Sequence, residues 1–366
     1  MNIAVFFGGR SCEHNISVAT GVQAANVLAG NGHKVYCVYV RRDGKWKSSR
    51  AFFDVEVFRG EPGGRSVYLL PGDNRLRFKR GVKKVRIDCA VLCMHGRNGE
   101  DGTIQGLLEL SRIPYTGGDV FASAAGMDKQ MMKKLFRADK IPSLKCVTIR
   151  KGENSDNAIK KINFALGFPV IVKPARAGSS IGIGIAHDRD ELSVALESAF
   201  LWDTKVVVER AIKNFTELNC AVIGDGRQSE AGQVEKPTSL SEFLTYDEKY
   251  HGKAKSGSGR EFPANIDEAT SERVRSLAVR AFDSVGASGI ARVDFLLDND
   301  TGKLYVNEIN TIPGSLALYL FPEKSKREML FLLIDIAIKR QKENDLLSCI
   351  LTSDDDEDCS WDDGLP

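Results

Sequence analysis

The sequence predicts an α/β protein that begins with an open parallel sheet and continues with mixed α+β units. An apolar run at 2–7 is followed by a helical pattern at 16–28 and a second apolar run at 34–40. A strand, a helix and a second strand in this order are the usual start of a parallel sheet. Further along, a glycine- and serine-rich loop at 175–184 separates two strand patterns, and two more strand patterns flank a turn-forming cluster near residue 300.

Composition places the chain among soluble globular proteins. It has 366 residues, enough for two or three domains of roughly 100–200 residues each. The 51 basic and 49 acidic residues leave a net charge of +2, which gives no reason to expect a nucleic-acid or membrane partner. Eight cysteines without a C-x-x-C pair and five histidines without zinc-type spacing favour neither a disulfide framework nor a zinc site. No stretch approaches the roughly 20 apolar residues that span a bilayer, so we expect a cytoplasmic protein.

Residues 1–121 are predicted to form a first, Rossmann-like domain. After the second strand, 41–87 is a polar excursion of short hairpins, and a buried strand at 89–94 then runs into the polar segment 95–102 and a helix at 103–111. The glycines after the first strand do not form the pattern G-x-G-x-x-G, so a dinucleotide-binding oxidoreductase is not expected.

Residues 122–212 are predicted to form a compact α+β unit, and residues 213–350 are predicted to form a further unit. Their helix and strand patterns follow in the order 122–138, 146–150, 157–166, 169–173, 184–186, 190–199, 205–209, 217–223, 290–297, 303–309 and 325–344. The long polar loop 237–260 is expected to be either a lid or a disordered segment, because loops of this length in compact domains are usually one or the other. The acidic residues 351–366 are expected to form a disordered tail.

The two strand patterns near residue 300 predict a hairpin with polar side chains on one face. If Leu297 pairs with Lys303 across the turn, Arg292 faces Glu308. Because side chains alternate along strands, four polar side chains then share one face: Arg292, Asp294, Glu308 and Asn310. A one-residue change of register would divide this set.

Two carboxylates and an amide oxygen on one face suit Mg²⁺, which prefers oxygen ligands and binds one or two carboxylates together with substrate phosphates. The alternative is a solvent-facing edge hairpin with ordinary salt bridges. The apolar neighbours Val293, Phe295 and Ile309 argue against that alternative, because apolar residues at these alternating positions are typical of a buried strand face.

The loop 175–184 is a candidate phosphate-binding loop. Its glycines and serines let backbone N–H groups approach phosphate oxygens, and Lys173 leaves a strand just before it. The loop lacks the G-x-x-x-x-G-K-[ST] pattern, so a plain tight hairpin is the alternative.

Together these motifs resemble those of the D-alanine–D-alanine ligase family, within the ATP-grasp superfamily. The stretches that carry the resemblance are 8–17, 95–106, 127–129, 172–182, 292–294 and 307–314. They occur in the family's order and cover residues from about 3 to 320. The resemblance implies an ATP-grasp fold behind an N-terminal open-sheet domain.

The resemblance also implies a role for individual residues. For ATP it implies Lys129, Lys173, Ser180 and Lys249 at the phosphates, and Glu209, Ile212 and Glu217 at the adenine and ribose. For two Mg²⁺ ions, which Mn²⁺ can replace, it implies Asp294, Glu308 and Asn310. For substrate and catalysis it implies Glu13, Ser179 and Tyr250 around the first amino acid, His95 near it, and Arg292 with the Gly314 N–H at the oxyanion.

The activity implied is the ATP-dependent ligation of two D-alanine molecules through an acyl phosphate, which supplies a peptidoglycan precursor. The partners are small molecules, and the sequence leaves a homodimer open. The chain departs from many relatives at 315–320, where Tyr319 stands in place of a small hydroxyl near the second substrate. A D-alanine–D-serine or related ligase is therefore an alternative. A non-catalytic nucleotide-binding protein is a more distant one, because none of the implied ligands is lost.

Overall fold

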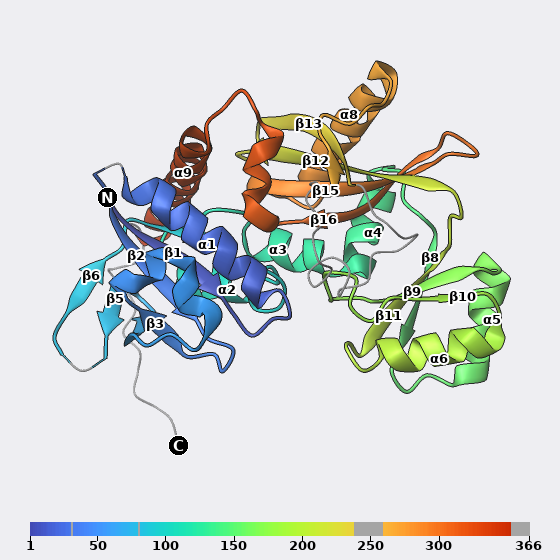
Figure 1. The fold of residues 1–366 in the computed structure, drawn as a ribbon, viewed down its shortest axis with the longest axis horizontal. Coiled ribbons are helices and arrows are strands. Elements are labelled where there is room, and N and C mark those ends of the chain that lie inside the picture. The colour runs from blue at the N-terminus through green and yellow to red at the C-terminus, as the bar shows by residue number, and fades with distance from the viewer. Residues whose placement is uncertain (31, 80, 238–258, 353–366) are drawn as a thin grey trace.

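The molecule is built around three sheets. The computed structural model describes residues 1–30, 32–79, 81–237 and 259–352, and for 348–352 it describes the backbone alone. The seven-stranded sheet lies at the left of Figure 1, the five-stranded sheet above, and the four-stranded sheet at the lower right. Most of the expected lid loop and residues 353–366 of the expected acidic tail lie outside the described residues, whereas residues 351–352 are the end of a helix.

The seven-stranded sheet is mixed, with a parallel centre. Its elements are β1 (Asn2–Gly8), α1 (His14–Ala29), β2 (Lys34–Val40), β3 (Trp46–Ser48), β4 (Arg65–Leu70), β5 (Asp73–Phe78), β6 (Lys84–Arg86), β7 (Cys89–Leu92) and α2 (Thr103–Leu110). Parallel pairing of β1 with both β2 and β7 confirms the predicted start, and the hairpins extend the sheet with antiparallel strands. The apolar run of β1 is almost entirely buried, as expected of a central parallel strand.

The single helix predicted at 122–138 is two helices. These are α3 (Val120–Met127) and α4 (Lys129–Ala138), and the chain turns between them at Asp128. Asp128 has extended backbone angles, and its side chain accepts hydrogen bonds from the N–H groups of Gln130 and Met131. Aspartate is a favoured N-cap, so it starts a new helix inside a continuous helical pattern.

The four-stranded sheet has its own helices and its own core. Its elements are β8 (Cys146–Arg150), α5 (Ser155–Leu166), β9 (Val170–Pro174), β10 (Gly184–Ala186), α6 (Arg189–Ala199) and β11 (Lys205–Arg210), with the strand order β10-β9-β11-β8. All pairings in the sheet are antiparallel. Every buried apolar member of its core lies between Val147 and Val208.

The five-stranded sheet has the order β14-β13-β12-β15-β16. Its elements, with the helical segments after it, are β12 (Phe215–Gly224), β13 (Ser229–Pro237), β14 (Arg260–Glu261), α8 (Glu268–Ser284), β15 (Gly289–Asp298), β16 (Leu304–Asn310), the 3₁₀ segment η3 (Gly314–Leu320) and α9 (Lys326–Thr352). Neither β13 nor α8 was predicted from the sequence. In α8 the buried positions Val274, Leu277, Ala278 and Ala281 follow helical spacing, so a pattern was present there.

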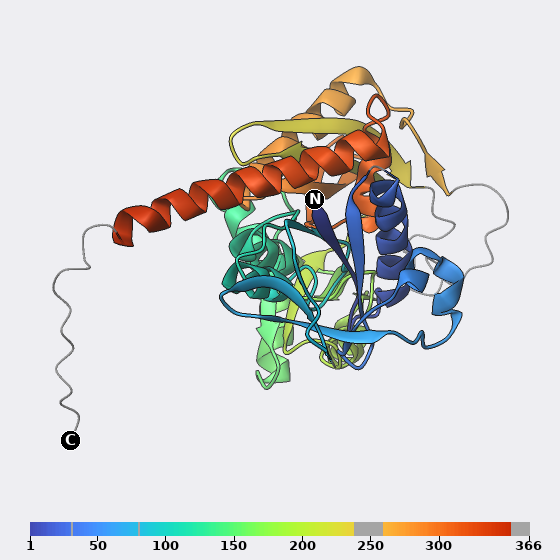
Figure 2. The ribbon, with the colours of Figure 1, turned by 90° about the vertical axis from the view of Figure 1, so that its left-hand side faces the viewer.

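The seven-stranded and five-stranded sheets share one hydrophobic core. Residues of β1 and β7 belong to the same buried cluster as Ile223 of β12, Ile290 of β15 and Leu330 of α9. Helix α9 lies across this junction and then extends away from the body of the molecule, as Figure 2 shows. Its Arg340 donates hydrogen bonds to the carbonyl oxygens of Gly117 at 2.7 Å and Tyr115 at 2.9 Å. Among the helices of the described residues, none combines the length and apolar character needed to cross a bilayer.

Candidate active site

The hairpin near residue 300 is present, but its predicted register is wrong. Leu297 pairs with Leu304 rather than with Lys303, because the turn is one residue longer than predicted. The predicted pairing of Arg292 with Glu308 is therefore also wrong. A single shift of this kind should have moved the polar residues of one strand to the opposite face.

A β-bulge restores the shared face. Between the pairs on either side of it, β16 carries one extra residue, Asn307, so that Asp294 lies opposite Glu308 and Arg292 lies opposite Asn310. Beyond the bulge the two single-residue shifts add up to two, which returns Glu308 and Asn310 to the same face as Arg292 and Asp294. A bulge also turns two successive side chains toward the same region. This explains why Asn307 and Glu308, although adjacent in the sequence, both line the cavity described next.

A cavity of about 310 Å³ lies between the four-stranded and five-stranded sheets. It is lined by nine of the predicted site residues: Lys129, Lys173, Ser179, Ser180, Ile212, Glu217, Arg292, Asp294 and Glu308. A smaller cavity of about 30 Å³ shares Lys129 and Glu308 with it and is lined also by Glu13 and Asn310. Glu209, His95 and Gly314 belong to the surrounding structure instead. Lys249 and Tyr250 lie outside the described residues.

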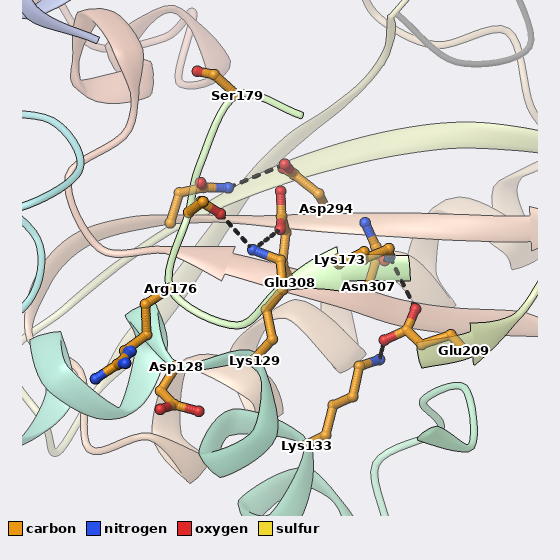
Figure 3. A network of polar contacts seen from close by, with 12 residues as sticks. Asp128, Lys129, Lys133, Lys173, Arg176, Ser179, Glu209, Asp294, Asn307 and Glu308 are labelled. Carbon is orange, nitrogen blue, oxygen red and sulfur yellow. Dashed lines mark hydrogen bonds and ion pairs between the residues drawn. The ribbon is translucent and has the colours of Figure 1, made fainter. Parts of the chain in front are cut away.

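Two lysines converge on one buried carboxylate behind the cavity (Figure 3). Glu209 is fully buried, and its oxygens form ion pairs with Lys133 Nζ at 2.8 Å and Lys173 Nζ at 2.9 Å. Lys173 Nζ also donates to Asn307 Oδ1 at 3.1 Å. Burial alone would raise the pKa of Glu209, but the charges of Lys133 and Lys173 outweigh burial and hold that pKa at about 2. Glu209 therefore stays ionised and fixes Lys173 at the wall of the cavity.

Replacing Lys133 by methionine should destabilise the protein by about 3 kcal/mol at pH 7, because it leaves a buried carboxylate with one cation fewer. A carboxylate whose pKa falls on folding contributes stability that is complete above its ordinary pKa, near 4.5, and is lost as the pH falls toward 2. The variant should therefore lose less stability than the parent over this pH range. Urea unfolding at several pH values measures both effects.

The matched control is Lys134→Met, the same substitution at an exposed position on the same helix. We expect it to change stability by no more than about 0.5 kcal/mol. Equal stability of the Lys133 and Lys134 variants would contradict the role given to Glu209.

Lys129 links the glycine-rich loop to the hairpin. Its Nζ donates to the carbonyl oxygen of Ala177 at 2.9 Å and lies 3.3 Å from Glu308 Oε2. In the same loop Ser179 and Ser180 have left-handed backbone angles, with φ of 53° and 58°. Non-glycine residues adopt this conformation uncommonly, and such residues are often found at functional sites.

The glycine-rich loop also contacts the segment between β1 and α1, beside the seven-stranded sheet. The Ser179 hydroxyl donates a hydrogen bond to the carboxylate of Glu13, the residue that immediately precedes α1. Burial raises the pKa of Glu13, and nearby Glu308 raises it further, while the Ser179 hydrogen bond and the charges of Lys129 and Arg292 oppose this. Two of the residues that the resemblance places around the first amino acid, Glu13 and Ser179, are therefore in direct contact.

Arg292 and Asp294 form a bidentate ion pair on one face of β15. Arg292 Nε lies 2.6 Å from Asp294 Oδ1, and Nη2 lies 2.7 Å from Oδ2. Asn310 Nδ2 donates to the same Asp294 Oδ2 at 3.0 Å. Burial would lower the pKa of Arg292, but Asp294 raises it above its usual range, so the guanidinium remains charged. Arg292, the predicted oxyanion residue, thus contacts the predicted metal ligand Asp294, which in turn contacts Asn310.

The segment after β16 is held by buried polar groups of the first domain. His95 Nδ1 donates to the Ile312 carbonyl oxygen at 2.7 Å, and the Ile312 N–H donates to Glu100 Oε1 at 3.1 Å. Burial lowers the pKa of His95 to about 4, so His95 is neutral near pH 7. Burial and the charge of Glu13 raise the pKa of Glu100 to about 8. These contacts fix the backbone that leads into Gly314.

The chain then makes an unusual left-handed turn. Ser315, Leu316 and Ala317 have φ of 51°, 52° and 47°, a conformation that costs L-residues roughly 1–2 kcal/mol each. The turn is followed by Tyr319, whose side chain lines the cavity. The Tyr319 hydroxyl donates to Glu235 Oε1 at 2.8 Å.

Several residues of this site were not predicted, among them Asn307, Glu100 and Glu235. Asn307 faces the cavity only because of the bulge, for which the sequence gives no signal. Glu100 lies in the polar segment that matched the family, and its spacing from His95 could have indicated it. Glu235 lies on β13, a strand whose charged residues hid its pattern.

Comparison with known proteins gives the same assignment along nearly the whole chain. The family model described as "D-ala D-ala ligase N-terminus" matches residues 2–118, and "D-ala D-ala ligase C-terminus" matches 135–331. A D-alanine–D-alanine ligase of Thermosipho africanus is 37% identical over 326 residues, 88% of each chain. The structure of the D-alanine–D-alanine ligase from Coxiella burnetii aligns with a TM-score of 0.82 and 27% identity, over 96% of this chain and 98% of that one. A D-Ala:D-Ser ligase from Enterococcus faecalis aligns with a TM-score of 0.79 and 31% identity, over 92% and 99%.

Proposed function

We infer from its membership of the D-alanine–D-alanine ligase family, to which this chain belongs, that it joins two D-alanine molecules with the use of ATP. The observation that carries this inference is the cavity of about 310 Å³ between the four-stranded and five-stranded sheets. Two lysines, an oxygen-rich strand face and a charged arginine line it together. Such a site can neutralise phosphate oxygens at one end and a developing oxyanion beside it.

The first step activates a carboxylate. The carboxylate of the first D-alanine attacks the γ-phosphorus of ATP, the bond to the bridging oxygen breaks, and an acyl phosphate and ADP result. Lys129 and Lys173 would neutralise the phosphate oxygens, and Glu209 would keep Lys173 in place. Glu13 and Ser179 would orient the first D-alanine through their hydrogen bond.

The second step forms the peptide bond. The ammonium group of the second D-alanine first releases a proton, and the resulting free amine attacks the acyl carbon; a tetrahedral oxyanion forms and collapses as phosphate leaves. Arg292, with the Gly314 N–H, would stabilise that oxyanion. His95 and Glu100 would act indirectly, because they hold the backbone that presents Gly314.

The donor set near Glu308 fits Mg²⁺. Asp294 on β15, with Glu308 and Asn310 on β16, offers oxygen atoms on one face of the hairpin, and hard cations prefer such ligands. These three residues would hold the ion, and the chemistry it would supply is positive charge for the phosphate oxygens. The cationic partners that these carboxylates have in the structure, Lys129 and Arg292, are then available to phosphate and oxyanion.

Release of ADP tests the proposal directly. With D-alanine, ATP and Mg²⁺ the protein should release ADP and form D-alanyl-D-alanine, identified by mass spectrometry; without D-alanine, ADP release should be at background. D-alanine-independent release would contradict the ligase assignment.

D-serine as the second substrate is a second candidate, favoured by the departure at Tyr319 and by the similarity to a D-Ala:D-Ser ligase. A mixture of D-alanine and D-serine distinguishes the two, because the mixed dipeptide should remain a minor product if D-alanine is the preferred acceptor.

A further inference from the structure

One end of the cavity carries a carboxylate that the steps above do not use. Glu235 lines the cavity, yet the residue is only 4% exposed. Its Oε1 accepts hydrogen bonds from Tyr319 Oη at 2.8 Å and Asn219 Nδ2 at 3.2 Å. Its Oε2 is buried and has no hydrogen-bond partner among the residues that the structure describes. Because a buried carboxylate oxygen without a donor is unfavourable, this oxygen is suited to a ligand that brings N–H groups.

Strand register places Glu235 relative to the metal-type carboxylates. Directly opposed residues form a row across four neighbouring strands, in the order Glu235, Asn219, Asp294 and Glu308. Neighbouring strands lie about 4.8 Å apart, so the strand of Glu235 is about 10 Å from that of Asp294. Glu308 and Glu235 therefore mark opposite ends of the row, and Arg292, beside Asp294, lies between them.

A guanidinium lies next to Glu235. Arg260 Nη1 is 3.9 Å from Glu235 Oε2, and the guanidinium stacks over the Tyr319 ring at 4.5 Å from its centroid. Stacking on an aromatic face restricts the position of the guanidinium. The Arg260 side chain is 48% exposed and lines the same cavity, so a ligand can reach it.

We propose that Glu235 and Arg260 recognise the second amino acid as a zwitterion, with Glu235 binding its ammonium group and Arg260 binding its carboxylate. This proposal rests on the proposed function and names the residues that select the acceptor. An acceptor of this chemistry carries both charges a few ångströms apart, which matches a carboxylate and a guanidinium side by side. A 2-hydroxy acid carries only the carboxylate and satisfies half of the pair.

Tyr319 is the positioning residue of this pair. Its hydroxyl proton is directed to Glu235, so it orients the carboxylate rather than offering that proton to the acceptor. The Arg260 guanidinium stacks on the Tyr319 ring, which restricts its position. The Tyr319 side chain thus positions both the Glu235 carboxylate and the Arg260 guanidinium, and this explains why a tyrosine replaces a small hydroxyl here.

The test separates the two charges of the acceptor. Glu235→Gln should raise the KM for the second D-alanine by about 10- to 100-fold, as expected when a hydrogen bond to a charged group is weakened. The inhibition constant of D-lactate at the same site should stay within about twofold, because D-lactate has no ammonium group. Arg260→Gln should weaken D-alanine and D-lactate together. Tyr319→Phe keeps the ring and should give a smaller change in the same direction as Glu235→Gln.

The matched control is Glu230→Gln, on the same strand but paired with Lys324 away from the cavity. It should leave all constants unchanged, and melting temperatures of every variant exclude misfolding. Equal weakening of D-lactate and D-alanine by Glu235→Gln, or an equal rise in the KM for ATP, would overturn the proposal. D-alanine-dependent ADP release by the unmodified protein tests the proposed function separately. A failure of the proposed function can therefore be distinguished from a failure of the acceptor-binding proposal.

Discussion

Glu308→Gln is expected to lower the rate of dipeptide formation by at least about a hundredfold, with little change in melting temperature. The carboxylate lies opposite Asp294 and 3.3 Å from Lys129, at the point where phosphate oxygens and the cation would meet. Stabilisation of charge by a bound metal is worth several kcal/mol, and glutamine keeps the shape of the side chain but removes its charge. The rate is measured as D-alanine-dependent ADP release at saturating Mg²⁺.

Glu272→Gln provides the control for this variant. The residue is an exposed glutamate on α8, paired with Arg275 on the same helix. It should retain the parental rate. If the Glu308 variant also turns over at a near-parental rate when Mg²⁺ is raised, Glu308 does not belong to the metal site.

Arg292→Lys is expected to reduce kcat by roughly a hundred- to a thousandfold, the usual effect of removing an oxyanion donor. Lysine keeps the charge but cannot reproduce the planar, bidentate contact that Arg292 makes with Asp294. The defect should lie in kcat more than in the KM for ATP, because the arginine acts on the oxyanion of the second step.

Rapid-quench measurement of the first turnover shows where this variant fails. Acyl phosphate should still form, while dipeptide should appear slowly. Arg227→Lys, at an exposed arginine paired with Glu343, is the matched control. A normal rate of peptide-bond formation in Arg292→Lys would remove Arg292 from the oxyanion site.

The sequence predicted the elements of the fold better than the contacts between them. Apolar runs such as 2–7 and 89–94 are read correctly because burial on both faces leaves an unmistakable pattern. The break at Asp128 was missed because a capping aspartate looks like any surface residue of a helix. Strand β13 was missed because Glu230, Glu235 and Lys236 interrupt its alternation.

The site could be predicted as a set of residues but not as a geometry. Arg292, Asp294, Glu308 and Asn310 were placed on one face from alternation alone, and they do share it. The pairing between them was wrong, because neither the length of a turn nor the position of a bulge follows from side-chain alternation. The ion-pair partners of Glu209 could not be predicted from the sequence either. Lys133 of α4 and Lys173 of β9 meet at Glu209 only when α4 packs against the four-stranded sheet.

The division of the apolar cores has a mechanical consequence. The seven-stranded and five-stranded sheets are joined by a common core, whereas the core of the four-stranded sheet lies wholly within 147–208. That sheet meets its neighbours through polar contacts such as Lys173–Asn307 and Ser179–Glu13. Polar contacts can be exchanged for water at little net cost, whereas separating a shared core exposes apolar surface. The four-stranded unit is therefore the compliant part of the molecule, and its amide protons should exchange through a partial opening of lower free energy than global unfolding.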